Sequence, residues 1–185
     1  MLRAVGWALV VDEPVEPADL IVVPQWAGTS GAIDAADLVH SGIADRVALL
    51  PEPAKPAERE LARRGVPYQN EAADLAQLLR ALGVATIEVV PIAAAGTEAE
   101  GRVLLSWCDQ HQFRSIVVVS AADHSRRVRR VLRRSLQGHQ TRVVVRSARY
   151  SAFDPNRWWQ TRDGVRTGIV ELQKLLLDVA RHPFS

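Results

Sequence analysis

The chain has 185 residues, of which 48% are hydrophobic, and its formal net charge is only +2. This length and composition predict one globular domain, residues 1–185, with a sizeable core. The single cysteine, Cys108, excludes an intrachain disulfide and a cysteine metal cluster, and its helical spacing from other apolar residues in VLLSWCDQH predicts burial in the core.

The apolar segments are too short for a membrane protein. No apolar run approaches the roughly 20 residues of a membrane helix. The opening stretch MLRAVGWALVV is too short for a complete signal peptide. We therefore expect a soluble chain without a complete membrane anchor.

Five short apolar runs, bounded by proline or polar residues, predict buried strands. The first is ADLIVVP, from Ala18 to Pro24, and the others are RVALLP, TIEVVPI, SIVVVS and RVVVRSA, which begin at Arg46, Thr86, Ser115 and Arg142. Helical patterns alternate with these runs, at Gly31 to Ser41, Pro56 to Arg64, Glu71 to Leu82, Thr97 to Gln110 and Asp123 to Leu136. This alternation predicts an α/β fold with a parallel sheet covered on both faces.

A last helix is predicted from about Val165 to Arg181. One apolar stripe along it should close one side of the domain, through Val165, Ile169, Leu172, Leu176 and Val179. Before this helix lie Trp158 and Trp159, which could stack on a ligand or pack the helix onto the sheet. We favour packing and expect at least one of the two tryptophans in the core.

Ligands of parallel α/β sheets gather at the carboxyl ends of the strands, beside helix N-termini. Five loops are therefore candidates: PQWAGTSG, LPEPAKPAE, AAAGTEAEG, SAADHSRR and SARYSAFDPNRWW. In the third, Thr97 and Glu100 have the spacing of a capping box. We favour that structural role, although a capped helix start can also face a ligand.

The segment from His124 to Phe153 contains nine arginines and no acid, which predicts a strongly positive edge. His124 and Arg127 lie one turn before the apolar stripe of their helix and should point toward the ligand edge of the sheet. Two cations at a helix N-terminus repel the helix dipole, so an anionic partner is expected. Charged residues flanking the stripe should mostly face solvent and are given no role in a site: Arg126, Arg129, Arg130, Arg133 and Arg134.

Two other kinds of site lack their signatures. The five histidines show no spacing typical of metal ligands, so we expect no metal site. No G-x-S-x-G nucleophile elbow occurs, and Ser120 stands at a strand end without one, which disfavours ordinary serine hydrolase chemistry.

From about Val11 to Asp178, the chain resembles the YdcF-like family of envelope-associated bacterial proteins. The resemblance is carried by PADLIVV, GTEAEG, VVVSAADHSRR and WW followed by ELQKLL. It implies a three-layer Rossmann-like domain with a mostly parallel five-stranded sheet, a role in envelope precursor metabolism, and S-adenosylmethionine or a nucleotide as a possible ligand. Cytoplasmic and envelope-associated locations both fit. The resemblance implies six site residues, which are Asp19, Thr97, Glu100, Ser120, His124 and Arg127.

We expect the domain to bind an anionic, phosphate-bearing small molecule. Arg127 would hold the anion, His124 would donate a hydrogen bond or move a proton, and Glu100 would act as a base or orient a hydroxyl group. If the protein is an enzyme, phosphoryl or pyrophosphoryl transfer or hydrolysis is the expected class. The alternative is a non-catalytic module whose arginine-rich edge contacts acidic lipid, nucleic acid or a protein; sequence-specific nucleic-acid binding is not expected, because no binding motif accompanies the charge.

Overall fold

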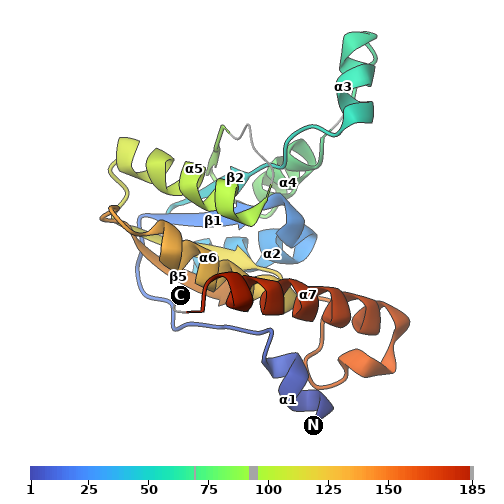
Figure 1. Cartoon of the computed structure of the whole chain (residues 1–185). Coiled ribbons are helices and arrows are strands. Elements are labelled where there is room, and N and C mark those ends of the chain that lie inside the picture. The colour runs from blue at the N-terminus through green and yellow to red at the C-terminus, as the bar shows by residue number, and fades with distance from the viewer. Residues whose placement is uncertain (69, 92–95, 184–185) are drawn as a thin grey trace.

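A computed structural model describes residues 1–68, 70–91 and 96–183. Its centre is a five-stranded sheet in the order β3-β2-β1-β4-β5, with every neighbouring pair parallel (Figure 1). The strands are β1 (Leu20–Pro24), β2 (Arg46–Leu50), β3 (Thr86–Val89), β4 (Ser115–Ser120) and β5 (Arg142–Ser147). All five predicted strands and their parallel arrangement are thereby confirmed. The predicted burial is wrong for β3, which has no buried residue because it lies at the edge of the sheet.

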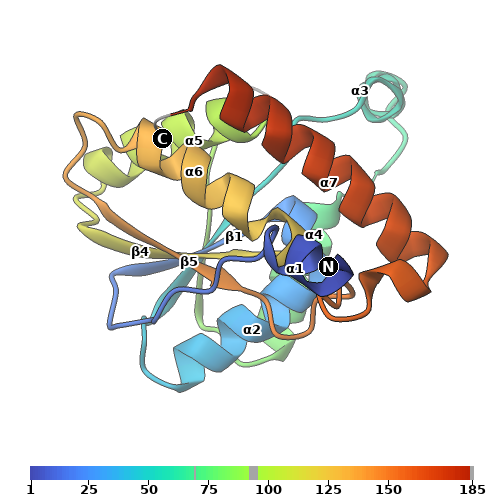
Figure 2. The same ribbon diagram turned by 60° about the horizontal axis from the view of Figure 1, so that its bottom comes forward.

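Helices cover both faces of the sheet and make it the middle of three layers. They are α2 (Gly28–His40), α4 (Glu71–Ala81), α5 (Thr97–Gln110) and α6 (Ser125–Ser135). Because side chains alternate along a strand, Ile21 and Val23 of β1 pack with α2 and α4 on one face, whereas Leu20 and Val22 pack with α5 and α6 on the other. Figure 2 shows α5 and α6 on the opposite side of the sheet from α2. This is the expected Rossmann-like α/β architecture.

Cys108 lies in the second of these cores, as predicted. Its side chain is fully buried, and burial raises the pKa of the thiol to about 12. The thiolate, which is the nucleophilic form, is therefore strongly disfavoured.

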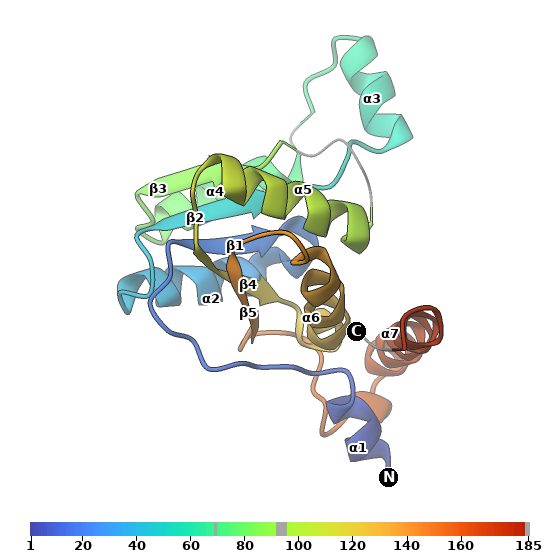
Figure 3. The ribbon, with the colours of Figure 1, turned by 60° about the vertical axis from the view of Figure 1, so that its left-hand side comes forward.

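Not every helix belongs to these layers. Helix α3 (Pro56–Arg63) carries no buried residue and projects from the domain (Figure 3). The sequence did not predict α1 (Leu2–Trp7), which lies beside the last helix, α7 (Arg162–Arg181). Among the described residues, no helix is both long and apolar enough to cross a membrane.

The predicted burial of α7 is wrong. Ile169, Leu176 and Val179 of the expected stripe are 46%, 67% and 40% exposed, whereas Glu171 and Leu175 are buried. The reason is that α7 packs on α6 and on the short helix η3 (Trp158–Gln160) rather than on the sheet. The buried face of α7 is therefore not the apolar stripe predicted from the sequence.

Trp158 confirms that at least one of the paired tryptophans belongs to the core. It is 7% exposed, donates a hydrogen bond from Nε1 to the carbonyl oxygen of Leu2 at 2.9 Å, and packs beside Leu9 and Leu175. A Cβ atom at Gly168 would lie 2.6 Å from its ring, so only glycine permits this approach of α7. Trp158 thus joins α1 and α7 in a small separate core.

Candidate functional site

A cavity of about 530 Å³ opens at the carboxyl edge of the sheet. Trp26 after β1, Glu52 after β2, Thr97 at the start of α5, His124 after β4 and Glu171 of α7 all contribute to its lining. The strand order reverses between β1 and β4, and ligands of such folds bind at this switch point. Four of the five candidate loops therefore meet here, although Ala93–Ala95 of the third lies outside the described residues.

Trp26 and Glu100 form one wall of the cavity. The ring of Trp26 lies 4.5 Å from that of His124, centroid to centroid, and its Nε1 donates a hydrogen bond to Oε2 of Glu100 at 3.3 Å. Glu100 is only 6% exposed. The tryptophan thus joins the loop after β1 to the loop after β4 and satisfies a buried carboxylate; the sequence analysis did not include it in the site.

The predicted capping box of Thr97 and Glu100 is wrong. Gly96 is the N-cap residue of α5, with a φ of 104°, and makes no side-chain cap. Oγ1 of Thr97 instead accepts a hydrogen bond from Nη1 of Arg127 at 2.9 Å, while Glu100 binds Trp26. Both side chains are therefore turned toward cavity residues rather than toward the helix terminus.

Glu171 is the centre of the charged side of the cavity. Its carboxylate lies 2.9 Å from Nδ1 of His124, 3.2 Å from Nε of Arg127 and 2.6 Å from Nζ of Lys174, and its side chain is 6% exposed. Burial alone would raise the pKa of Glu171, but His124, Lys174 and Arg127 together lower it to about 2. The carboxylate is therefore ionised throughout the neutral range.

The anionic partner expected for His124 and Arg127 is thus provided by the chain itself. The prediction had assigned that charge to a ligand. Glu171 follows His124 by 47 positions, and only its pairing with Lys174 three residues later is visible in the sequence. The sequence signal for Glu171 would have been a carboxylate on the buried face of the last helix. The apolar stripe predicted a different face to be buried, so this signal could not be recognised.

Arg127 fixes the orientation of His124. Its Nη2 lies 2.6 Å from Nε2 of the histidine, whose Nδ1 faces Glu171. Nη2 also lies 3.1 Å from Nδ1, so the imidazole is held between the guanidinium group of Arg127 and the carboxylate of Glu171. For His124 to exchange a proton with a ligand through Nε2, Arg127 must first move away from it.

Asp123 is a further cavity residue that the sequence analysis missed. Burial is the main reason why its pKa is raised above the ordinary value. Ligand atoms of Asp123, His124 and Glu171 lie within 4.8 Å of one another, a spacing that a metal ion could bridge. Arg127 and Lys174 already occupy Glu171, however, and their positive charges oppose a cation there, so we assign no metal to this cluster.

Two predicted site residues do not line the cavity. Asp19 lies at the opposite, amino end of β1, where its carboxylate accepts hydrogen bonds from the backbone N–H groups of Arg114 and Ser115 at 2.7 and 2.8 Å. Although burial tends to raise the pKa of Asp19, these bonds lower it overall. Asp19 therefore joins the ends of β1 and β4 and cannot contact a ligand in this cavity.

Ser120 is fully buried at the end of β4. Its hydroxyl group donates a hydrogen bond to the carbonyl oxygen of Ala121 at 3.0 Å. The structure thus brings four of the six predicted residues together at the cavity: Thr97, Glu100, His124 and Arg127.

The expectation that the flanking arginines of α6 mostly face solvent is also wrong. Nε of Arg129 lies 2.6 Å from Glu13, and Asp178 of α7 binds both Arg130 and Arg134 at 2.6 Å. These three arginine side chains are 17–19% exposed. The acids come from distant parts of the chain, so the positive segment seen in the sequence is largely neutralised in the fold.

Comparisons with known proteins do not identify a family for this chain. No family model and no curated protein matches the sequence. A solved structure of a mycobacterial quinone oxidoreductase is similar with a TM-score of 0.33 and 12% identity, over 100% of this chain and 52% of that one. The chain thus spans about half the length of that neighbour, and a likeness of this degree carries no argument about function. The resemblance to the YdcF-like family stays a prediction from the sequence.

Proposed function

We propose that the cavity binds an anionic, phosphate-bearing small molecule. The observation that carries this proposal is the convergence of three basic side chains, His124, Arg127 and Lys174, beside the N-terminus of α5 in one cavity at the switch point of the sheet. Arginine, lysine and unpaired helical N–H groups are the common donors to phosphate oxygens in proteins.

Glu171 fixes the side chains of Arg127 and Lys174 but binds only some of their N–H groups. Lys174 is 49% exposed and directs one N–H to Glu171, whereas an ammonium group has three. Arg127 has five N–H groups, two of which point to Glu171 and Thr97 and another to His124. An anion entering the cavity can therefore bind the remaining N–H groups while the buried carboxylate keeps the cations from repelling one another.

The first turn of α5 supplies backbone donors. The first helical hydrogen bond runs from the N–H of Glu100 to the carbonyl oxygen of Gly96. The N–H groups of the preceding residues have no helical acceptor, as at every helix start, and Gly96 and Thr97 line the cavity. These groups favour negative charge at the same place as Arg127.

If the protein turns over its ligand, phosphoryl or pyrophosphoryl transfer or hydrolysis is the class that these residues suit. His124 would move a proton after an anion has drawn Arg127 away from Nε2, and Glu100 would act as a base or orient a hydroxyl group. A role in envelope precursor metabolism is part of this proposal and rests on the sequence resemblance alone.

The alternative, a non-catalytic module that uses an arginine-rich edge, gains no support from the geometry. Such an edge needs exposed and unneutralised arginines, whereas Arg129, Arg130 and Arg134 are mostly buried against acids of the same chain.

Calorimetric titration with inorganic phosphate and pyrophosphate tests the proposal. Arg127→Ala should weaken binding by about 1.5–3 kcal/mol, which is roughly tenfold to over a hundredfold in Kd. Because Arg127 also binds Glu171, Lys174→Ala is the second variant; its side chain is half exposed, and we expect a loss of about tenfold in affinity with the fold retained. His124→Ala should weaken binding less than Arg127→Ala and should abolish any turnover.

Arg133→Ala is the matched control, because Arg133 is exposed on the same helix and does not line the cavity. Its affinity for phosphate should equal that of the unmodified protein. Equal losses at Arg127, Lys174 and Arg133 would contradict a specific site, since they indicate that surface charge acts collectively.

A further inference from the structure

A second cavity, of about 480 Å³, adjoins the first. Gly96, Thr97, Arg127 and Lys174 line both cavities, so the start of α5 stands between them. The second cavity lies between α5, α6 and α7, and the two cavities together are called the groove below. Each cavity by itself has a volume typical of small-molecule sites.

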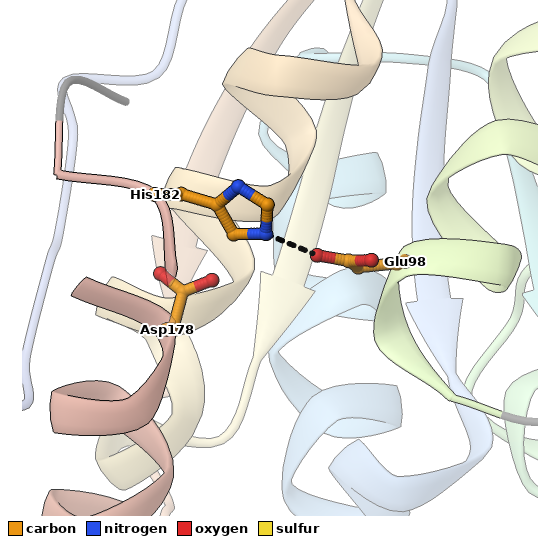
Figure 4. Close-up of side chains that lie close together, drawn as sticks. All are labelled: Glu98, Asp178 and His182. Carbon is orange, nitrogen blue, oxygen red and sulfur yellow. Dashed lines mark ion pairs between the residues drawn. The ribbon is translucent and has the colours of Figure 1, made fainter. Parts of the chain in front are cut away.

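The acids of the second cavity already have cationic partners. Asp178 binds Arg130 and Arg134, each at 2.6 Å, and Glu98 lies 3.0 Å from Arg134. Figure 4 shows Glu98 of α5 and His182, just after α7, directed toward one another, with a separation of 3.5 Å between Oε1 and Nε2. These pairs leave the acids of the second cavity little uncompensated negative charge.

Two arginines of the second cavity have no such partner. Arg102 of α5 and Arg181 of α7 are exposed, and neither makes an ion pair or a side-chain hydrogen bond with any residue that the structure describes. With Arg127 and Lys174 they give this half of the groove an excess of positive charge. An anionic group entering there would meet cations that no acid of the described chain neutralises.

The first cavity has a different character at its far end. Trp26 offers an aromatic surface, and Glu52 and Glu100 offer carboxylate oxygens, with Lys55 as an exposed cation near them. Carboxylates repel phosphate but accept hydrogen bonds from amino and hydroxyl groups, and an indole ring stacks on a flat heteroaromatic ring. The groove is thus aromatic and acidic at one end and cationic at the other.

We propose that the ligand is a nucleoside di- or triphosphate that spans both cavities. Its base lies beside Trp26, its amino and ribose hydroxyl groups face Glu52 and Glu100, and its phosphates pass the start of α5 toward Arg102 and Arg181. This inference rests on the proposed function, because the phosphates contact Arg127 and Lys174 on the way. It adds the class of ligand and a second set of phosphate-binding residues.

Titration with inorganic phosphate, pyrophosphate, AMP, ADP and ATP measures how much the base and the phosphates each contribute to affinity. ADP or ATP should bind at least about tenfold more tightly than AMP or pyrophosphate, since only they fill both ends of the groove. Binding should change the tryptophan fluorescence. Trp26→Leu should reduce this change and weaken ATP binding about tenfold, a loss in the range measured for base–aromatic stacking. It should weaken pyrophosphate binding less than ATP binding, because pyrophosphate has no base to stack.

Arg102→Ala and Arg181→Ala test the second cavity. Each should weaken ATP binding by about threefold to tenfold and leave the affinity for inorganic phosphate unchanged, because a single phosphate is held at Arg127 and Lys174. Arg166→Ala is the matched control: Arg166 is exposed on α7 but lines neither cavity. Both arginine variants change exposed side chains without described partners, so the fold should be retained.

The possible outcomes distinguish the two proposals. Phosphate binding that depends on Arg127, without tighter binding of ADP or ATP, would overturn the nucleotide inference and leave the proposed function intact. ATP binding that is equal in Arg102→Ala, Arg181→Ala and Arg166→Ala would remove the second cavity from the site. Absence of binding to all five probes would overturn both proposals.

Discussion

Two buried carboxylates, Glu171 on α7 and Asp34 on α2, are both close to basic side chains, yet their environments shift the carboxyl pKa in opposite directions. Glu171 makes hydrogen bonds with the cations at the cavity, and its pKa falls to about 2. Asp34 is fully buried and lies 3.6 and 3.5 Å from Nε of Arg146 and Arg149, beyond good hydrogen-bond distance. Its oxygens have no hydrogen-bond partner among the described residues, and burial raises its pKa despite the two arginines.

The difference shows that proximity to a positive charge does not by itself compensate a buried carboxylate. Removing a charge from water costs several kcal/mol, and only well-aligned hydrogen bonds added to the Coulomb attraction offset that cost. Glu171 meets this condition and organises the cavity. Asp34 does not, so it should reduce the stability of the fold at neutral pH.

Removing the charge of Glu171 should have the largest effect. Glu171→Gln keeps the size of the side chain but leaves Arg127 and His124 without their carboxylate, and we expect a loss of about 3 kcal/mol in the free energy of unfolding. Urea denaturation at neutral pH measures this. Glu16→Gln is the control, because Glu16 pairs with Arg142 on the surface and should contribute less than about 0.5 kcal/mol. Equal effects of the two substitutions would contradict the comparison.

Acid should abolish the contribution of Glu171. Its folded pKa of about 2 lies below the ordinary 4.5, so the stabilisation is complete above pH 4.5 and is lost as the pH falls toward 2. That difference corresponds to about 3 kcal/mol. Denaturation across this range should show the unmodified protein approaching the stability of Glu171→Gln. A difference between the two proteins that does not change with pH would indicate that Glu171 acts through packing rather than charge.

Asp34→Asn should have the smallest effect and the opposite sign. The folded pKa of Asp34 is raised above the ordinary 3.8, so ionisation costs stability progressively as the pH rises through and above that value. Removing the charge should therefore stabilise the fold at neutral pH, while Arg146 keeps Asp12 as a partner. The gain should disappear below pH 3.8, where the carboxyl is neutral in both states. Destabilisation at neutral pH would show that the two arginines compensate Asp34 after all.

The sheet and most helices could be predicted because their signals are local. Each strand is a run of four to six residues, and in the three central strands β1, β2 and β4 the apolar character reflects burial on two faces, as in SIVVVS of β4. Helix α5 begins and ends at the predicted residues, Thr97 and Gln110. The start of α6 shifted, because the chain first forms the short helix η2 (Ala122–His124) after β4.

The site could be predicted only in part. His124 and Arg127 follow a strand end, and the geometry of parallel sheets places such residues at the carboxyl edge. Glu171 and Trp26 were missed because their contacts join segments 47 and 98 positions from His124. The capping box failed for the same reason: Arg127 competes for Thr97 from 30 positions away.

Local sequence patterns specify the elements, their alternation and the parallel sheet, because apolar periodicity and helix signals act within a few residues and recur along the whole chain. Which charged side chains meet depends instead on how distant segments pack together. Of the nine arginines in a segment that contains no acid, four on α6 form ion pairs with Glu13, Glu171 and Asp178, since the folded chain brings these acids from other segments onto the helix. For a buried carboxylate, the direction of the pKa shift then depends on hydrogen-bond geometry. That geometry is the reason why the pKa of Glu171 is lowered and the pKa of Asp34 is raised.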